Sequence, residues 1–263
     1  GPLSLGGTWG GQACYDRIDF RTHVYETSCW ILVTVLCYYL FHISDQLSII
    51  IDNLVKSQKT LPTSGYIERS LNLILTLIHF GMFIHLIYFK WNFKGLVNLL
   101  QPCHLILLLE GIALGSVYFR TPSDGDAKLD ELAKKKVDKN RYMYLCDLIS
   151  LLILPSLCGT FLATLFPDTD GLHQYLEKES YFVQHYLIQI TPFHLLLREQ
   201  GKVLKECSFA TICIGLWFCI LIHWTFFELL DLMTMVNVEF MLCPTTAMDV
   251  IFSNDIFPAF LFV

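Results

Sequence analysis

The fold is decided by the stretch Ser208–Leu230, which reads SFATICIGLWFCILIHWTFFELL. No Lys, Arg, Asp or Glu occurs in it before Glu228. A bilayer core about 30 Å thick is crossed by roughly 20 apolar residues in an α-helix. The stretch is therefore predicted to be a transmembrane helix.

The composition supports the same class of protein across all 263 residues. Apolar residues make up 54% and charged residues 16%, and the mean hydropathy is +0.51. Soluble domains carry about 25% charged residues. The formal net charge of −6 is modest and spread along the chain, so the charge pattern does not indicate a nucleic-acid-binding protein.

Further long apolar runs predict an all-α, polytopic transmembrane helix bundle that forms a single domain. Polar segments rich in Gly and Pro separate these runs. We expect six spans, at Ser28–Ile43 (with a possible extension to Ile51), Ile67–Phe89, Leu96–Phe119, Tyr142–Phe166, Ser180–Leu197 and Ser208–Leu230. The tail, residues 231–263, is expected to lie on the lumenal side with a re-entrant turn, and its final apolar run reads as a seventh span that is cut off.

Charge predicts the orientation of the six spans. Most of the 18 Lys and Arg residues fall in the first, third and fifth loops, including the basic loop at residues 120–141. The positive-inside rule places these loops in the cytoplasm and the N-terminus in the lumen or outside the cell. Residues 128–141 are most simply a solvated loop, with contact to anionic lipid as the alternative.

Most of the ten cysteines are expected to be packing residues, since no CxxC pair occurs. Cys14 and Cys243 both fall on the predicted lumenal side, where an oxidising compartment would permit a disulfide between them.

Ionisable groups at membrane depth are the candidates for function. The predicted topology brings Cys103, His104, His185, His223 and His85 from four helices to one depth, roughly 6–12 Å below the lumenal boundary. His79 and Glu110 lie deeper, and Glu110 is too far from Cys103 to act on its thiol.

Cys103 is the strongest of these candidates because it follows Pro102. If the regular helix begins at Pro102, the thiol lies in its first turn, where free N–H groups favour a thiolate. If the helix begins at Leu96, Pro102 kinks it instead. A Cys that only packs in the membrane is the alternative to a nucleophile.

The predicted base for Cys103 is His185, which comes from another helix. Tyr181 and Gln189, one turn before and after it, could share its polar face and are predicted to contact substrate. His104 is turned about 100° away from Cys103, so it is expected to bind a substrate phosphate or carbonyl, and His223 is a further predicted substrate contact. A structural hydrogen bond between helices is the alternative for His185 and His223.

Three stretches and a spacing in this chain resemble the transmembrane protein 164 family. The stretches are Leu99–Leu105 (LLQPCHL), Leu165–Pro167 (LFP) and Tyr181–His185 (YFVQH), and the spacing sets His223 and Asn237 ahead of Met241–Pro244 (MLCP). The resemblance covers most of the chain from about Cys14 to Pro244. The family usually has Asn in place of Gln101, and its last span is absent here.

The resemblance implies a Cys-dependent acyltransferase that moves a C20:4 acyl chain onto a lyso ether-phosphatidylethanolamine. Its motif Cys and paired His correspond to Cys103 and His185. The expected partners are phospholipid and lysophospholipid substrates in an endoplasmic reticulum or Golgi membrane, with no cofactor and no metal.

Three alternatives stay open at this point. The first is a lipid hydrolase that uses the same Cys and His, and the second is a lipid-binding, scaffold or transport protein without catalysis. The third is a metal or haem site built from His85, His104, His185 and His223, although no tight ligand spacing favours it.

Overall fold

The computed structural model describes residues 16, 19–58, 66–92, 96–120, 146–167, 169, 172, 174–205, 207–234 and 236–237. Within these residues every regular element is a helix, which confirms the predicted all-α class. The proposed Cys14–Cys243 disulfide, the basic residues 128–141 and most of the tail, including its final apolar run, lie outside the described residues.

The first predicted span is two helices rather than one. α2 runs over Phe20–Leu40 and α3 over Ile43–Gln58, and they meet at an angle of 61°. The bend occurs at His42, whose φ of 47° lies in the left-handed region. α2 begins eight residues before the predicted Ser28, because nothing in the polar stretch from Phe20 breaks a helix.

The second predicted span is one long helix. The third is divided just before Pro102 into a 3₁₀ turn and an α-helix. α4 covers Tyr66–Asn92, the 3₁₀ turn η2 covers Leu96–Leu100, and α5 covers Pro102–Arg120. The regular helix thus begins at Pro102, which decides between the two readings of the sequence.

The fourth predicted span is a helical segment over Cys146–Leu165, which is interrupted by the 3₁₀ turn η4 (Leu154–Ser156) around Pro155 and ends as α7 (Leu157–Leu165). The fifth is α8, Glu177–Lys205, which is longer than the apolar stretch Ser180–Leu197 because charged residues extend it at both ends.

The stretch quoted first forms α9 (Phe209–Ile222), the π-helix η5 (His223–Phe227) and α10 (Glu228–Thr234). A capping box opens α9: the Thr211 N–H donates to Ser208 Oγ at 3.2 Å, and the Ser208 N–H donates to Thr211 Oγ1 at 3.3 Å. These bonds satisfy N–H groups that have no partner inside the helix.

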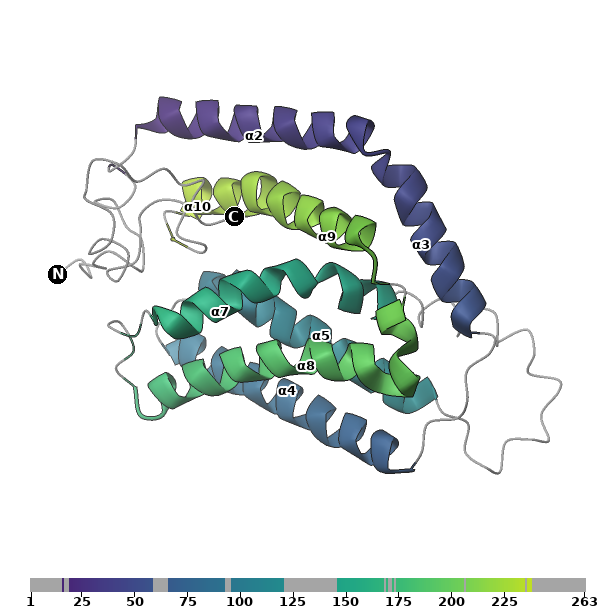
Figure 1. Ribbon diagram of the computed structural model, residues 1–263. Coiled ribbons are helices and arrows are strands. Elements are labelled where there is room, and N and C mark those ends of the chain that lie inside the picture. The colour runs from purple at the N-terminus through teal and green to yellow at the C-terminus, as the bar shows by residue number, and fades with distance from the viewer. Residues whose placement is uncertain are drawn as a thin grey trace, which may run out of the picture.

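The helices are arranged in two groups (Figure 1). α4, α5, α7 and α8 pack against one another, while α9 lies between this group and α2. One apolar cluster joins α4, α5 and α8 through Leu86, Leu107 and Ile188, and a second joins α3, α8 and α9 through Leu54, Leu196 and Ile214.

The prediction of six spans is not confirmed. By length and composition, three helices among the described residues could cross a membrane: Tyr66–Trp91, Cys146–Leu165 and Phe209–Thr234. The bent pair α2–α3 makes a fourth if it counts as one span. The apolar part of α5, Pro102–Tyr118, is too short to pass, and α8 does not qualify because polar and charged residues interrupt its apolar run.

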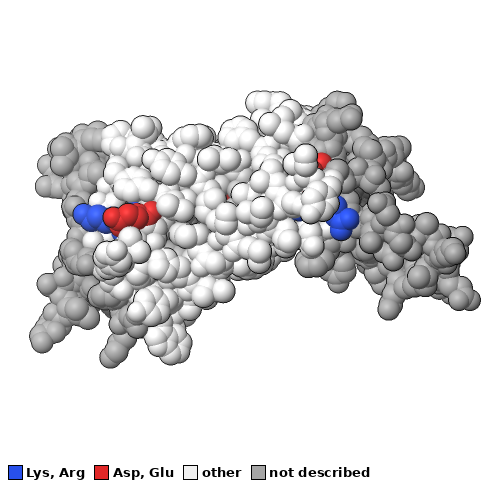
Figure 2. Space-filling model, turned by 90° about the horizontal axis from the view of Figure 1, so that it is seen from below, with Lys and Arg blue, Asp and Glu red and all other residues white. Residues whose placement is uncertain are grey.

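The surface agrees with a membrane location. Figure 2 shows the Lys, Arg, Asp and Glu side chains near the two ends of the molecule, with a wide uncharged surface between them on this face. Large apolar side chains are exposed on α2 and α4, such as Leu32 at 68% and Leu77 at 62%. Such a surface is costly in water and suited to lipid.

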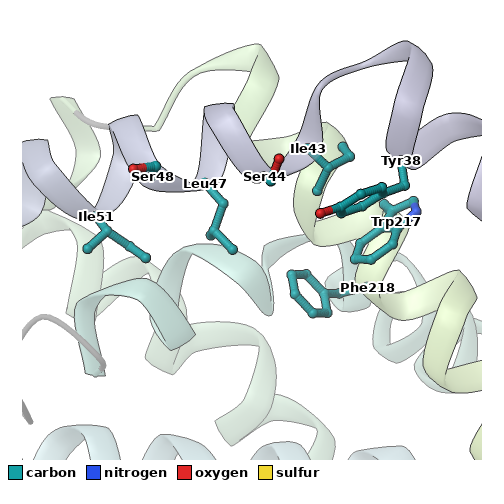
Figure 3. Close-up of a pocket in the computed structure, with 8 residues that line it drawn as sticks. All are labelled: Tyr38, Ile43, Ser44, Leu47, Ser48, Ile51, Trp217 and Phe218. Atoms are coloured by element: carbon teal, nitrogen blue, oxygen red, sulfur yellow. The ribbon is translucent and has the colours of Figure 1, made fainter.

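The bend between α2 and α3 encloses an open apolar hollow of about 340 Å³ against α9 (Figure 3). Tyr38, Leu47, Trp217 and Phe218 project into it, and Ser44 and Ser48 lie on its α3 side. None of the predicted site residues lines it.

Candidate functional site

Cys103 is the second residue of α5, so it lies in the first turn of the helix as predicted. The Gln101 carbonyl accepts from the N–H groups of His104 (2.9 Å) and Leu105 (3.1 Å). The Cys103 sulfur interacts with its own N–H and with that of His104. These N–H groups at the start of a helix favour negative charge on the sulfur.

Two side chains from other helices reach the Cys103 thiol. Lys90 near the end of α4 interacts with it electrostatically, and Gln184 on α8 interacts with it through its side chain. Gln184 is 1% exposed, and its Nε2 has no partner at full hydrogen-bonding distance. A buried amide N–H beside a thiol is poised to donate to a group that binds there.

The predicted histidines are held in one tautomer by backbone carbonyls. His185 Nδ1 lies 2.7 Å from the Tyr181 carbonyl, and His104 Nδ1 lies 2.6 Å from the Asn98 carbonyl. Because a carbonyl only accepts, each Nδ1 carries the proton and each Nε2 keeps a lone pair. Both imidazoles are therefore oriented to act as bases or acceptors through Nε2.

The structure brings Cys103, His104 and His185 to one end of the α4–α5–α8 group, where His104 and His185 interact electrostatically. Among the interactions of Cys103 with described residues, the side-chain partner on α8 is Gln184, the residue before His185. No direct Cys103–His185 hydrogen bond is formed between them in this state. Catalytic hydrogen bonds often form only once substrate binds.

We define the Cys103 cluster as Lys90, Cys103, His104, Glu177, Gln184 and His185. Lys90 joins it to Glu177, the first residue of α8, through a further electrostatic interaction. Five of the six residues are less than 9% exposed. Cys103 itself is half-buried and packs into the apolar cluster that contains Ile188.

Tyr181 and Gln189 flank His185 as predicted, but their polar groups bind α7. Tyr181 O–H donates to the Ala163 carbonyl at 2.8 Å, and Gln189 Nε2 donates to the Thr160 carbonyl at 2.9 Å. The ring of Tyr181 packs on His185 with centroids 4.2 Å apart. Their predicted contact with substrate remains a prediction, whereas their role in holding α8 on α7 is established.

The other two histidines of the predicted set have different surroundings. His223 begins the π-helix η5, and its ring contacts Trp224, which stacks on Trp30 of α2. His85 on α4 packs on Phe89. The groups that act on the Cys103 thiol are instead Lys90, Gln184 and the N–H groups of the first turn. Within the described residues no group of three or more His, Cys, Asp and Glu side chains is arranged to hold a metal ion.

Two buried polar clusters lie apart from Cys103. On α4, α5 and α8, His79 Nε2 lies 3.3 Å from Glu110 Oε2 and 3.1 Å from Thr191 Oγ1. At the start of α2, His23 Nδ1 lies 2.8 Å from Glu228 Oε1 of α10. Glu110 lies about two turns beyond Cys103 on α5, and the contact of His23 with Glu228 was not predicted from the sequence.

Sequence reasoning missed three members of the Cys103 cluster. Lys90 was counted only among the loop Lys and Arg residues that set the orientation, and Glu177 was not considered. Gln184 entered only as the residue before His185 in the stretch Tyr181–His185 that carries the family resemblance. The signal that could have found Lys90 is its place one helical turn after Leu86, on the buried face of α4.

The chain was compared with models of known protein families and with solved structures. The model of the TMEM164 family matches residues 21–262, which is nearly the whole chain. No solved structure matches it.

Proposed function

Since the chain belongs to the TMEM164 family, we propose that it is a membrane acyltransferase with Cys103 as its nucleophile. The acyl chain is of the polyunsaturated C20:4 type. The donor is a phospholipid and the acceptor is a lyso ether-phosphatidylethanolamine. The family resemblance supplies the substrates, and the Cys103 cluster supplies the chemistry.

One observation carries the proposal: a thiol in the first turn of a helix shares a buried cluster with two imidazoles, an amide and the amino group of a lysine. His185 and His104 both keep a free lone pair on Nε2. Side chains of this kind occur together where a nucleophile must lose a proton and an oxyanion must be stabilised.

The first half-reaction acylates the thiol. His185 Nε2 accepts the Cys103 proton as the sulfur attacks the ester carbonyl of the donor lipid. The apolar packing around Cys103 disfavours a free thiolate, so proton transfer accompanies the attack. The backbone N–H groups of the first turn and the Gln184 amide stabilise the oxyanion. The ester C–O bond then breaks, and the lysolipid leaves with the proton from His185.

The second half-reaction transfers the acyl chain. The hydroxyl of the acceptor lysolipid gives its proton to His185 and attacks the thioester carbonyl. The C–S bond breaks, and the Cys103 sulfur recovers the proton. A dry, apolar site favours the lipid hydroxyl over water as acceptor.

Intact-protein mass spectrometry tests the proposal. The full chain in vesicles is incubated with a donor phospholipid that carries a C20:4 chain, and the mass of one acyl group is expected on Cys103. Cys103→Ala should lose both the adduct and the transfer to the lysolipid. The exposed Cys158 provides the matched control, since Cys158→Ala should keep both.

The remaining alternatives give different results in this experiment. Free fatty acid released at the same rate with and without lysolipid would identify a hydrolase. Full transfer activity in Cys103→Ala would contradict the proposed nucleophile, and the absence of any adduct or turnover in the wild type would favour a lipid-binding protein.

A further inference from the structure

Lys90 and Glu177 form a buried pair of opposite charges beside the proposed nucleophile. Lys90 is 7% exposed and Glu177 is 8% exposed. The ammonium group of Lys90 interacts with both the reactive Cys103 sulfur and the Glu177 carboxylate.

The backbone immediately before Glu177 has an unfavourable conformation. Leu176, immediately before it, has a φ of 65°, in the left-handed region that a Leu side chain disfavours. The Gln174 N–H donates to Glu177 Oε2 at 3.1 Å, and Gln174 Nε2 lies 3.5 Å from the Phe89 carbonyl, next to Lys90. This turn fixes the carboxylate against the end of α4.

A structural role alone is a weak explanation for such a pair. Removing two charges from water is costly, and apolar residues of similar volume often stabilise a protein as well or better. Strained backbone tends to occur where a group must be held for a ligand. A pair of this kind beside a lipid-modifying thiol has the charge pattern of a zwitterion.

We propose that Lys90 and Glu177 recognise the headgroup of a zwitterionic phospholipid. Lys90 binds the phosphate and Glu177 binds the headgroup ammonium, so the two charges of the lipid replace those of the internal pair. Only a few bonds separate the phosphate from the sn-2 oxygen of the glycerol. Binding the phosphate at Lys90 therefore brings the reacting ester or hydroxyl to Cys103.

This inference rests on the proposed function, and it concerns the headgroup rather than the acyl transfer. Two residues beside Glu177, Lys178 and Glu179, are exposed and provide matched controls for loss of one charge. Glu177→Gln removes the charge but keeps an oxygen that can accept from Gln174 N–H.

The test compares two acceptors with the same donor in vesicles: a zwitterionic lysophosphatidylethanolamine and an anionic lysophosphatidylglycerol. The wild type and Glu179→Gln should prefer the zwitterionic acceptor. Glu177→Gln should lose that preference by roughly tenfold or more, as expected for a lost charge-assisted contact, through KM rather than kcat. An unchanged preference in Glu177→Gln, or an equal loss with both acceptors, would overturn the inference.

A charge-swapped variant separates recognition from structure and guards against a variant that fails to fold. Lys90→Glu with Glu177→Lys keeps an internal pair but places the carboxylate beside the thiol. Transfer to the zwitterionic acceptor should fall at least tenfold. Recovery of wild-type transfer in this double variant would show that the pair is only structural.

A donor without a headgroup distinguishes an error in the proposed nucleophile from an error in the proposed headgroup site. The p-nitrophenyl ester of the C20:4 acid should acylate Cys103 in the wild type and in Glu177→Gln to the same extent. If the wild type is not acylated, the proposed nucleophile is wrong. If both are acylated and the headgroup preference does not change, only the assignment of Lys90 and Glu177 is wrong.

Discussion

The Nδ1–H of His185 donates a hydrogen bond of 2.7 Å to the carbonyl of Tyr181, one helical turn earlier on α8. The ring is thereby fixed with its basic Nε2 directed away from its own helix backbone. His185 is 4% exposed, so solvent does little to reorient it. The orientation of the His185 ring thus depends on the backbone carbonyl of residue 181, which remains in place when the Tyr181 side chain is replaced.

Replacement of His185 should remove general base catalysis. We expect His185→Ala to lower kcat for acyl transfer by roughly 10²–10⁴-fold, with a smaller change in KM. The exposed His42 supplies a control, and His42→Asn suits its positive φ and should leave the rate unchanged. If His185→Ala kept the wild-type kcat, the general base would be His104 or water instead of His185.

Tyr181→Phe should affect stability more than activity. The change removes the 2.8 Å hydrogen bond from the Tyr181 hydroxyl to the Ala163 carbonyl but keeps the carbonyl that orients His185. We expect a loss of about 1 kcal/mol in the free energy of unfolding and a rate within about twofold of the wild type. A tenfold rise in KM without loss of stability would instead make Tyr181 a substrate contact, as the sequence predicts.

Glu110→Gln should be tolerated. His79 Nδ1 bonds to the Leu75 carbonyl at 2.8 Å, which leaves a single lone pair on Nε2 to accept from Thr191 or from a protonated Glu110. A neutral carboxyl donates in this position, and a Gln amide can replace it. We expect a change below about 1 kcal/mol for Glu110→Gln and a loss of about 1–3 kcal/mol for Glu110→Ala, measured by thermal unfolding in detergent. A loss of about 3–5 kcal/mol in Glu110→Gln would reveal a charged pair.

Gly215→Ala should destabilise the contact between α9 and the segment before α7. An added Cβ at Gly215 would lie 2.9 Å from the Leu152 carbonyl oxygen and 3.0 Å from Pro155 Cγ. Backbone cannot move as a side chain end can, so we expect a loss of about 1–3 kcal/mol. Gly81→Ala meets nothing within 4 Å and should be neutral or slightly stabilising. Equal stability of the two variants would contradict the close packing of α9.

The position of Cys103 could be predicted from sequence because Pro102 is a local signal. A proline is favoured at the first position of a helix wherever the helix lies in the fold. The start of α2 was misjudged for the opposite reason: apolarity marks membrane depth, and Phe20–Thr27 is helical without being apolar. The bend at His42 depends on packing against α9, which no local pattern encodes.

Part of the Cys103 cluster could be predicted from the sequence, and there is a physical reason why the other part could not. Cys103, His104 and His185 fall at similar depths on their helices, so counting residues along each span brings them together. Lys90 and Glu177 lie at helix ends, where a charge is ordinarily solvated. Their burial depends on the turn at Gln174–Leu176, whose conformation follows from tertiary contacts rather than from residue type.

The contact between α2 and α9 sets an order of events during synthesis. The Trp217 Nε1–H donates to the Thr34 carbonyl at 2.8 Å across 183 residues of sequence, and Trp30 stacks on Trp224, so α2 is held mainly by helices that are synthesised much later. At roughly 5–20 residues per second, the partner of α2 is synthesised about 10–40 s after α2 itself. During that interval His23 also lacks Glu228 of α10, whose carboxylate oxygen lies 2.8 Å from His23 Nδ1 in the complete fold.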